Sequence, residues 1–193
     1  MPRDNGPCIA PRNWHDPMAA VRALLVALDE WVVSDRAPPD SVVPRIDNGT
    51  LVPADRVTFP ALPGVTWPRH ANDVAPLPDW TAANASSQTY GALVPQVEKD
   101  GNEQAGIRLP DIAVPLGTFA GWNLYAPPYP AGELADREGT FLAFAETAAE
   151  RQRNGDPRRS VAERYPNGNA ALRREATQAL LRERLLLADD AAD

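Results

Sequence analysis

Cysteine and long apolar segments are what this sequence of 193 residues most clearly lacks. With Cys8 alone, the chain can form no internal disulfide, and a thiolate zinc site of the usual kind is excluded. The longest apolar run, residues 23–28, is far shorter than the roughly 18 residues that cross a bilayer. Residues 1–7 contain no apolar region of the kind found in a secretory signal. We therefore expect no membrane partner and, by default, a cytoplasmic protein.

Positive charge and histidine are scarce as well. The formal net charge is −7, and a field of that sign repels the phosphates of nucleic acids. The two histidines, His15 and His70, have no metal-ligating spacing, so no metal site is expected. The sequence also has no Gly-x-Gly-x-x-Gly or Walker-type loop to hold nucleotide phosphates. These absences argue against nucleic-acid binding, and no cofactor is predicted.

A complete hydrolytic site is missing from the sequence. None of the serines lies in Gly-x-Ser-x-Gly, the turn that exposes the nucleophile in many hydrolases. Ser160 fits a helix capping box with Glu163, and Cys8 has no adjacent cation to activate its thiol. His15 precedes a long amphipathic helix. It is either a candidate catalytic base or a polar residue near a helix N-terminus.

Proline, by contrast, is abundant. The chain has 21 prolines, about 11% of its residues, against a typical frequency near 5%. Fifteen of them lie between Pro38 and Pro130, so this stretch is predicted to be extended and irregular. The sequence predicts a single partial domain with four parts: a loop over residues 1–15, an amphipathic helix over 16–36, a proline-rich wrapping segment over 37–130 and a helical tail over 131–193.

The amphipathic helix has clear boundaries in the sequence. Asp16 and Pro17 favour its start, and Pro38 and Pro39 prevent its continuation. Its apolar stripe recurs at helical spacing and comprises Val21, Leu24, Leu25, Leu28, Trp31 and Val32. The proline-rich segment offers few regular elements to cover this stripe. We therefore predict that an apolar patch stays exposed on the monomer.

Turn and cap residues predict the remaining elements. Asp100-Gly101 is a strong turn signal within a hairpin over residues 92–109, inside the proline-rich segment. In the tail, cap and breaker residues predict three helices, over residues 141–153, 160–165 and 169–187.

The segment over residues 117–124 combines small residues with an aromatic ring and an amide. Gly117 and Gly121 permit close approach of the backbone. Trp122 has a large apolar face, and Asn123 has both a hydrogen-bond donor and an acceptor. This mixture is typical of a pocket wall, which makes Trp122 and Asn123 candidate substrate-pocket residues. The alternative is a twisted strand packed on the core, with Trp122 buried.

Many short motifs, in the same order, resemble the C-terminal part of a bacterial family described only as alpha/beta hydrolase domain proteins. They extend over nearly the whole chain, at residues 21–32, 38–45, 47–52, 59–60, 63–65, 100–103, 105–110, 114–124, 155–158 and 160–166. The resemblance implies an α/β-hydrolase-like fold in which most of the core, the nucleophile and the catalytic histidine lie N-terminal to Met1. This chain would then supply the last core helix and an extended wrap over the sheet.

Two functions are compatible with these patterns. In the first, the chain is the C-terminal fragment of an α/β-hydrolase-like protein that acts on a carboxylic ester or a related acyl bond, and it is inactive alone. Its partner is then the missing N-terminal hydrolase core, and the substrate of the parent protein is a small-molecule ester. In the second, the chain is a non-catalytic module that wraps a protein partner through its proline-rich segment, with Trp67, Trp80 and Trp122 as anchors.

Overall fold

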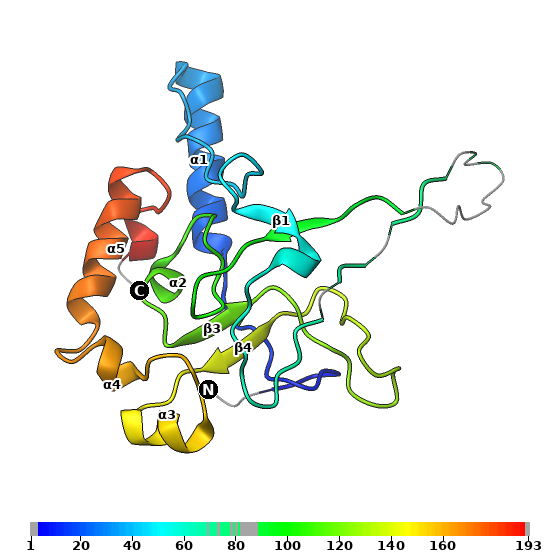
Figure 1. Cartoon of the computed structure of the whole chain (residues 1–193). Coiled ribbons are helices and arrows are strands. Elements are labelled where there is room, and N and C mark those ends of the chain that lie inside the picture. Colours follow the sequence, from blue (N-terminus) through cyan, green and yellow to red (C-terminus); the bar gives the residue numbers. More distant parts are fainter. Residues whose placement is uncertain are drawn as a thin grey trace.

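The computed structural model describes residues 4–68, 70–72, 74–77, 79, 81 and 89–191. Two small antiparallel sheets lie at its centre, with the helices on one side and long connections on the other (Figure 1). In chain order the elements are α1 (Met18–Ser34), β1 (Leu51–Pro53), η1 (Ala54–Arg56), β2 (Leu93–Pro95), α2 (Pro110–Ala113), β3 (Gly117–Ala120), β4 (Thr140–Ala143), α3 (Ala148–Asn154), α4 (Val161–Arg164), α5 (Ala170–Arg182) and η2 (Asp189–Ala191).

The β3–β4 sheet forms the buried centre of the fold. Phe119 of β3 lies opposite Phe141 of β4, with ring centroids 4.8 Å apart, and Trp14 packs edge-on against both rings. All four residues of β3 are buried. Position 117 requires glycine, because an added Cβ would lie 2.7 Å from the carbonyl oxygen of Leu142. The close backbone approach predicted for Gly117 is therefore present.

The other strand contacts join segments that are far apart in the sequence. Isolated bridges pair Cys8 with Tyr125 and Arg12 with Thr140, so the N-terminal segment is attached to the edge of the central sheet. The second sheet pairs β1 with β2 in antiparallel register, Leu51 opposite Pro95. These long-range pairings hold the irregular middle of the chain in a defined conformation.

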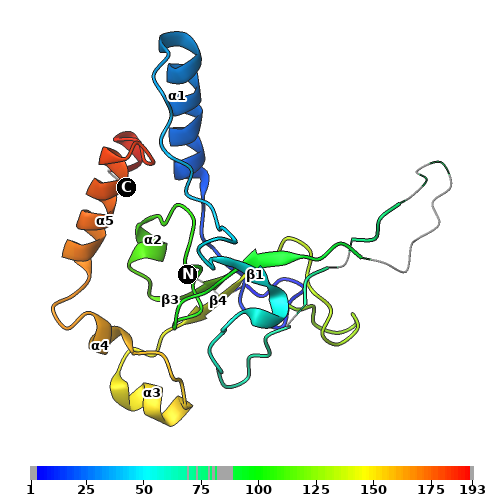
Figure 2. The same cartoon turned by 45° about the horizontal axis from the view of Figure 1, so that its top comes forward.

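Helix α1 stands away from the sheets (Figure 2). Its large apolar side chains are exposed. The helix begins after Pro17, where the Met18 N–H donates to Asp16 Oδ1 at 2.9 Å. It ends at Ser34, and the next residue, Asp35, has a positive φ. Its buried residues are the alanines Ala20, Ala23 and Ala27. All six side chains of the predicted apolar stripe are at least 38% exposed. The described chain thus packs the small residues of α1 and leaves the large ones uncovered.

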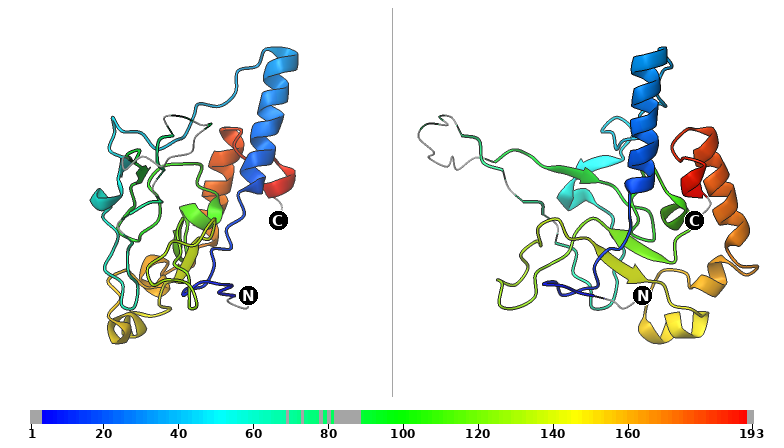
Figure 3. Two further views of the ribbon diagram at one scale, coloured as in Figure 1. Left: turned by 90° about the vertical axis from the view of Figure 1, so that its right-hand side faces the viewer. Right: turned by 180° about the vertical axis from the view of Figure 1, so that it is seen from behind.

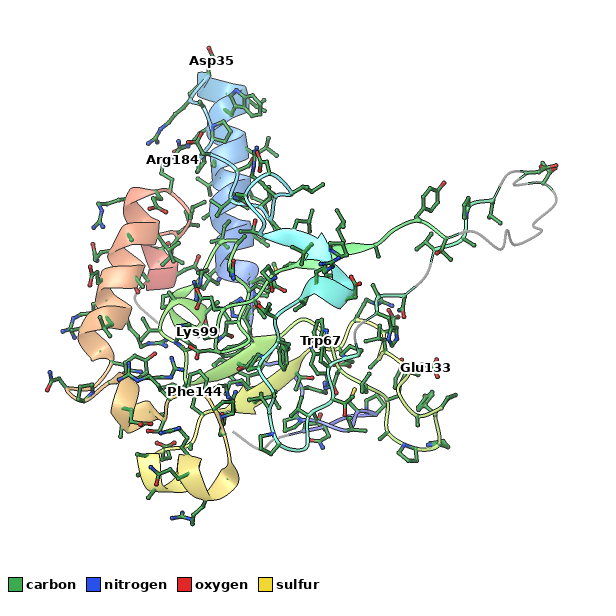
Figure 4. The ribbon with its side chains drawn as sticks, viewed as in Figure 1. Asp35, Trp67, Lys99, Glu133, Phe144 and Arg184 are labelled. Carbon is green, nitrogen blue, oxygen red and sulfur yellow. The ribbon has the colours of Figure 1, made fainter. Side chains whose placement is uncertain are left out.

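The base of α1 is joined to the C-terminal helices. A small core lies there, made by Ala20, Leu109, Leu180, Leu185 and Leu186. Two ion pairs also join α1 to the C-terminal segment, Arg22 with Asp190 near the base and Arg184 with Glu30 toward the far end of the helix. Both α1 and α5 stand on the same side of the sheets (Figure 3), and Arg184 is seen between them in Figure 4.

The hairpin predicted over residues 92–109 is only partly formed. Its turn is present, with Gly101 at a φ of +83° and the Glu98 N–H donating to the carbonyl of Asn102 at 2.8 Å. The backbones of its two arms form one bridge among the described residues, between Val97 and Glu103 beside the turn, and an ion pair between Arg108 and Glu98 also joins the arms. Strand β2 pairs with β1 instead of with the second arm. The strand partner therefore differs from the prediction.

A strand also replaces the start of a helix predicted in the tail. Residues 140–143 form β4, whereas the sequence predicts a helix from residue 141. Helix α3 begins only after Thr147, whose Oγ1 accepts a hydrogen bond from the Glu150 N–H at 3.2 Å. Phe141 belongs to the sheet because it packs on Phe119, and this tertiary contact outweighs local helix propensity.

The later helices follow the local signals more closely. Helix α4 starts at a capping box: the Glu163 N–H donates to Ser160 Oγ at 3.3 Å, and the Ser160 N–H donates to the Glu163 carboxylate at 2.8 Å. Helix α5 is shorter than the predicted 169–187 and ends at Arg182. Among the helices that the structure describes, none combines the length and the apolar character that crossing a membrane requires.

Candidate functional site

A cavity of about 240 Å³ lies between β2, the turn that follows it and the end of β3. Its apolar wall comes from separate stretches of chain and includes Ala54, Trp67, Pro68, Ala71, Val94, Pro95, Val97, Ala120, Trp122, Leu134 and Ala135. Three side chains with polar groups also line it, those of His70, Asn72 and Glu103. A mainly apolar wall with a few polar groups is typical of small-molecule sites.

Aromatic rings hold one side of this cavity in place. The rings of Phe59 and Trp67 are stacked with their centroids 5.2 Å apart. Trp122 packs edge-on against both, at 5.5 Å from Phe59 and 5.4 Å from Trp67. The indole N–H of Trp67, labelled in Figure 4, is buried and forms no hydrogen bond with any part of the chain that is described. Mutual packing of this kind gives the cavity a preformed wall.

Glu103 is positioned by the fully buried Asn102 beside it. The Asn102 side chain accepts a hydrogen bond from the Phe119 N–H at 2.8 Å and donates one to the carbonyl of Gly117 at 3.1 Å, so it ties the turn to β3. Glu103 Oε1 lies 3.3 Å from the position that a Cβ on Gly121 would take. The carboxyl group therefore lies directly over the chain that carries Trp122.

The carboxyl group of Glu103 has no counter-ion among the residues that the structure describes. Burial raises the pKa of Glu103 above its usual value. Within the described ranges, no hydrogen bond or ion pair reaches its side chain. A carboxylate removed from water is unfavourable unless it is paired or protonated. Sequence reasoning missed this residue, and the one local signal is its position after the turn at Asp100-Gly101.

The structure places the two predicted pocket residues differently. Trp122 lines the cavity. Asn123 is fully buried, and its amide nitrogen donates to the carbonyls of Ala10 and Gly139, at 3.1 Å in each case. The polar atoms of Asn123 are therefore committed to the backbone, and they join the N-terminal segment to the chain before β4.

His15 lies elsewhere and has an acidic partner. Its Nδ1 is 2.7 Å from Oδ2 of Asp111 in the first turn of α2, and both side chains are 18% exposed. Burial raises the pKa of Asp111, but the hydrogen bond and charge of His15 outweigh burial and leave that pKa below its usual value. A base oriented by a carboxylate is one part of a hydrolytic triad. Asp111 was not predicted, because 96 residues separate it from His15.

No described side chain supplies the nucleophile for that pair. Ser160 is fully buried and bonded within its capping box, and none of the described serines or cysteines is hydrogen bonded to His15. Burial, followed by the charge of Glu138, raises the pKa of the Cys8 thiol, which makes the thiolate harder to form. Ser86 and Ser87, like Trp80, lie outside the described residues. Where side chains are described, no group of three or more His, Cys, Asp or Glu could hold a metal ion.

Comparison with known proteins adds one match. The family model described as "Alpha/beta hydrolase domain" matches residues 2–193. No curated protein and no solved structure matches the chain. The interaction-module alternative is not favoured by this match, and two of its three proposed anchors, Trp67 and Trp122, are packed against each other.

Proposed function

The chain belongs to the alpha/beta hydrolase domain family, and from this premise we propose that it forms part of an acyl hydrolase whose nucleophile lies outside these 193 residues. The reaction would be the hydrolysis of a carboxylic ester or a related acyl bond. Serine hydrolases of this class expose their nucleophile on a Gly-x-Ser-x-Gly turn, and the sequence contains no such turn. The chain alone is then inactive.

The observation that carries this proposal is the uncovered apolar face of α1. In α/β folds, helices cover both faces of a largely parallel sheet. The described residues contain only two antiparallel sheets of two strands each. Helix α1 meanwhile exposes large side chains such as Leu25, at 59%, and Val32, at 77%. We propose that this face packs on the sheet of a hydrolase core supplied by a preceding polypeptide segment.

Within such an assembly, His15 is the candidate base and Asp111 the group that orients it. The chain order counts against this role. Triad residues of α/β hydrolases follow the order nucleophile, acid, histidine, whereas His15 precedes Asp111. A structural role for the pair, fastening the N-terminal segment to α2, fits the geometry equally well and has no such conflict.

The test begins with the purified chain and p-nitrophenyl esters, for which we expect no turnover above the blank. The reading frame ahead of Met1 is then searched for Gly-x-Ser-x-Gly within a few hundred residues, and the encoded segment is co-expressed with this chain. We expect turnover only from the pair. Leu25→Glu with Leu28→Glu should abolish pairing, whereas Arg174→Glu, on an exposed position of α5, should not.

Two outcomes contradict the proposal. One is robust ester hydrolysis by the chain alone that Ser86→Ala or Ser87→Ala abolishes, because the nucleophile would then lie within it. The other is an isolated, independently expressed gene with no hydrolase core encoded nearby. That result would favour the non-catalytic wrapping module.

A further inference from the structure

We propose that the cavity beside Trp122 binds a small organic cation, such as an alkylammonium group, with Glu103 as its counter-ion. This site is independent of the proposed hydrolase activity and is formed by residues of this chain alone. Three observations support it: a carboxyl group without a partner among the described residues, an aromatic wall, and a described lining that contains no lysine or arginine.

The carboxyl group supplies the charge for recognition. Glu103 lines the cavity and has no partner among the described residues, although most other partly buried acids here have one. Asp100, for example, is ion-paired with Arg164, and Asp156 with Arg158. Placing a ligand cation beside Glu103 would remove the cost of leaving a carboxylate unpaired in an apolar wall.

The aromatic wall suits the same ligand. Trp67 and Trp122 both line the cavity, and the face of an indole ring attracts a cation that lies within about 6 Å of its centre. The carboxyl of Glu103 lies over Gly121, next to Trp122 in the chain. An ammonium group in this cavity would therefore have the carboxyl group of Glu103 and the two indole side chains in its walls.

The size of the cavity and the charges around it narrow the class of ligand further. The cavity volume of about 240 Å³ is smaller than the roughly 300–1,000 Å³ of typical ligand pockets, so it suits a small ligand. No lysine or arginine is among the described lining residues, so no permanent positive charge of the described wall repels a ligand cation. The Nδ1 of His70 donates to the carbonyl of Pro68 at 2.7 Å. The net charge of −7 also favours the approach of cations over anions.

The experiment compares three probes of the same shape and different charge. Choline is the cation, 3,3-dimethylbutan-1-ol is its uncharged analogue, and 3,3-dimethylbutanoate is the anion. Binding to the full chain is followed by calorimetry and by tryptophan fluorescence. We expect choline to bind at least tenfold more tightly than the alcohol, and the anion to bind least.

Matched variants assign the effect to Glu103. Glu103→Gln should reduce the preference for choline over the alcohol to about one. It should not reduce the amount of folded protein, because it removes a half-buried charge that has no partner among the described residues. Glu133→Gln, which removes the same charge from an exposed loop position labelled in Figure 4, should leave the preference unchanged. Trp122→Leu should weaken the binding of choline more than the binding of the alcohol. Lowering the pH should also weaken the binding of choline to the natural chain, because a protonated Glu103 carries no charge.

Several results would overturn the proposal. Equal affinity for choline and the alcohol would make the site a simple apolar cavity. Tighter binding of the anion would reverse the proposed polarity. A choline preference that survives Glu103→Gln would place the cation elsewhere, and binding of none of the three probes would rule the site out.

Discussion

Arg158 and Asp156 form the most deeply buried ion pair in the described part of the chain. Their side chains are 5% and 12% exposed, and Nη2 of Arg158 lies 2.7 Å from Oδ2 of Asp156. The other end of the guanidinium donates to Thr118 Oγ1 at 2.8 Å and to the carbonyl of Leu142 at 2.9 Å. One side chain therefore fastens the loop after α3 to both strands of the central sheet.

Removing Arg158 should destabilise the protein strongly. Arg158→Ala leaves Asp156 as a buried charge without its partner, which typically costs about 3–5 kcal/mol. The free energy of unfolding, measured in urea, should fall by about that amount. Arg174→Ala, an exposed position on α5, is the control and should change it by less than about 0.5 kcal/mol. Equal losses in the two variants would contradict the prediction.

The coupling between Arg158 and Asp156 should depend on pH. Burial raises the pKa of Asp156, but the hydrogen bonds from Arg158 outweigh burial, so its pKa in the folded state lies below the usual value. Such a carboxyl stabilises the fold above its unfolded pKa of about 3.9, and this stabilisation is lost as the pH falls through the folded pKa. A double-mutant cycle of Arg158→Ala and Asp156→Asn should show coupling at pH 7 that declines below about pH 4. A coupling energy below pH 4 that equals the value at pH 7 would contradict this prediction.

Asn123→Ala should act on stability and not on a ligand. The substitution leaves the carbonyl of Ala10 without its donor and removes one of the two donors of the Gly139 carbonyl, which also accepts from the Asn13 N–H at 3.0 Å. A buried group left unsatisfied costs about 1–3 kcal/mol. Thermal unfolding should show the loss. Asn72→Ala is the comparison, since that residue is exposed and lines the cavity. It should leave stability nearly unchanged. Any activity of the assembled hydrolase, expressed per folded molecule, should be unaffected by Asn123→Ala.

The elements that the sequence predicts well are those set by neighbouring residues. Asp16 and Pro17 mark the start of α1, and the capping box of α4 consists of two side chains three residues apart. The hydrogen bonds of these caps join residues within one helical turn. They therefore form independently of tertiary contacts.

The elements that were missed depend on partners distant in the sequence. Residue 141 lies in a stretch of good helix formers, yet its contact with residue 119 makes it a strand. The cavity is assembled from stretches around residues 67, 94, 103, 121 and 134, so no local pattern marks it. Glu103 and Asp111 carry no motif. Their environment appears only when the chain is folded.

The apolar face of α1 should be replaceable without loss of folding. Leu25 and Leu28 are 59% and 50% exposed, so Leu25→Gln with Leu28→Gln should reduce the binding of a hydrophobic dye and the self-association of the chain. Stability should stay within about 0.5 kcal/mol of the natural chain. Ala23→Gln is the matched change on the packed face, where the residue is 2% exposed. Forcing a larger side chain into a packed site typically costs about 1–3 kcal/mol. A dye-silent, monodisperse monomer before any substitution would contradict the prediction.

His15→Gln should separate a structural role from a catalytic one. If the pair with Asp111 fastens the N-terminal segment to α2, the substitution removes a hydrogen bond to a charged group, worth about 1.5–3 kcal/mol, and lowers the free energy of unfolding. A double-mutant cycle with Asp111→Asn should recover that coupling. In the assembled hydrolase, kcat per folded molecule should then change less than tenfold.

Loss of a catalytic base gives a different result, because general-base catalysis contributes about 10²–10⁴-fold to the rate. A fall of that size in kcat, at unchanged folded fraction and with a similar fall for Asp111→Asn, would make His15 the base despite the chain order. We expect the smaller change. The 2.7 Å contact ties residue 15 to residue 111, and no described serine or cysteine is bonded to the ring.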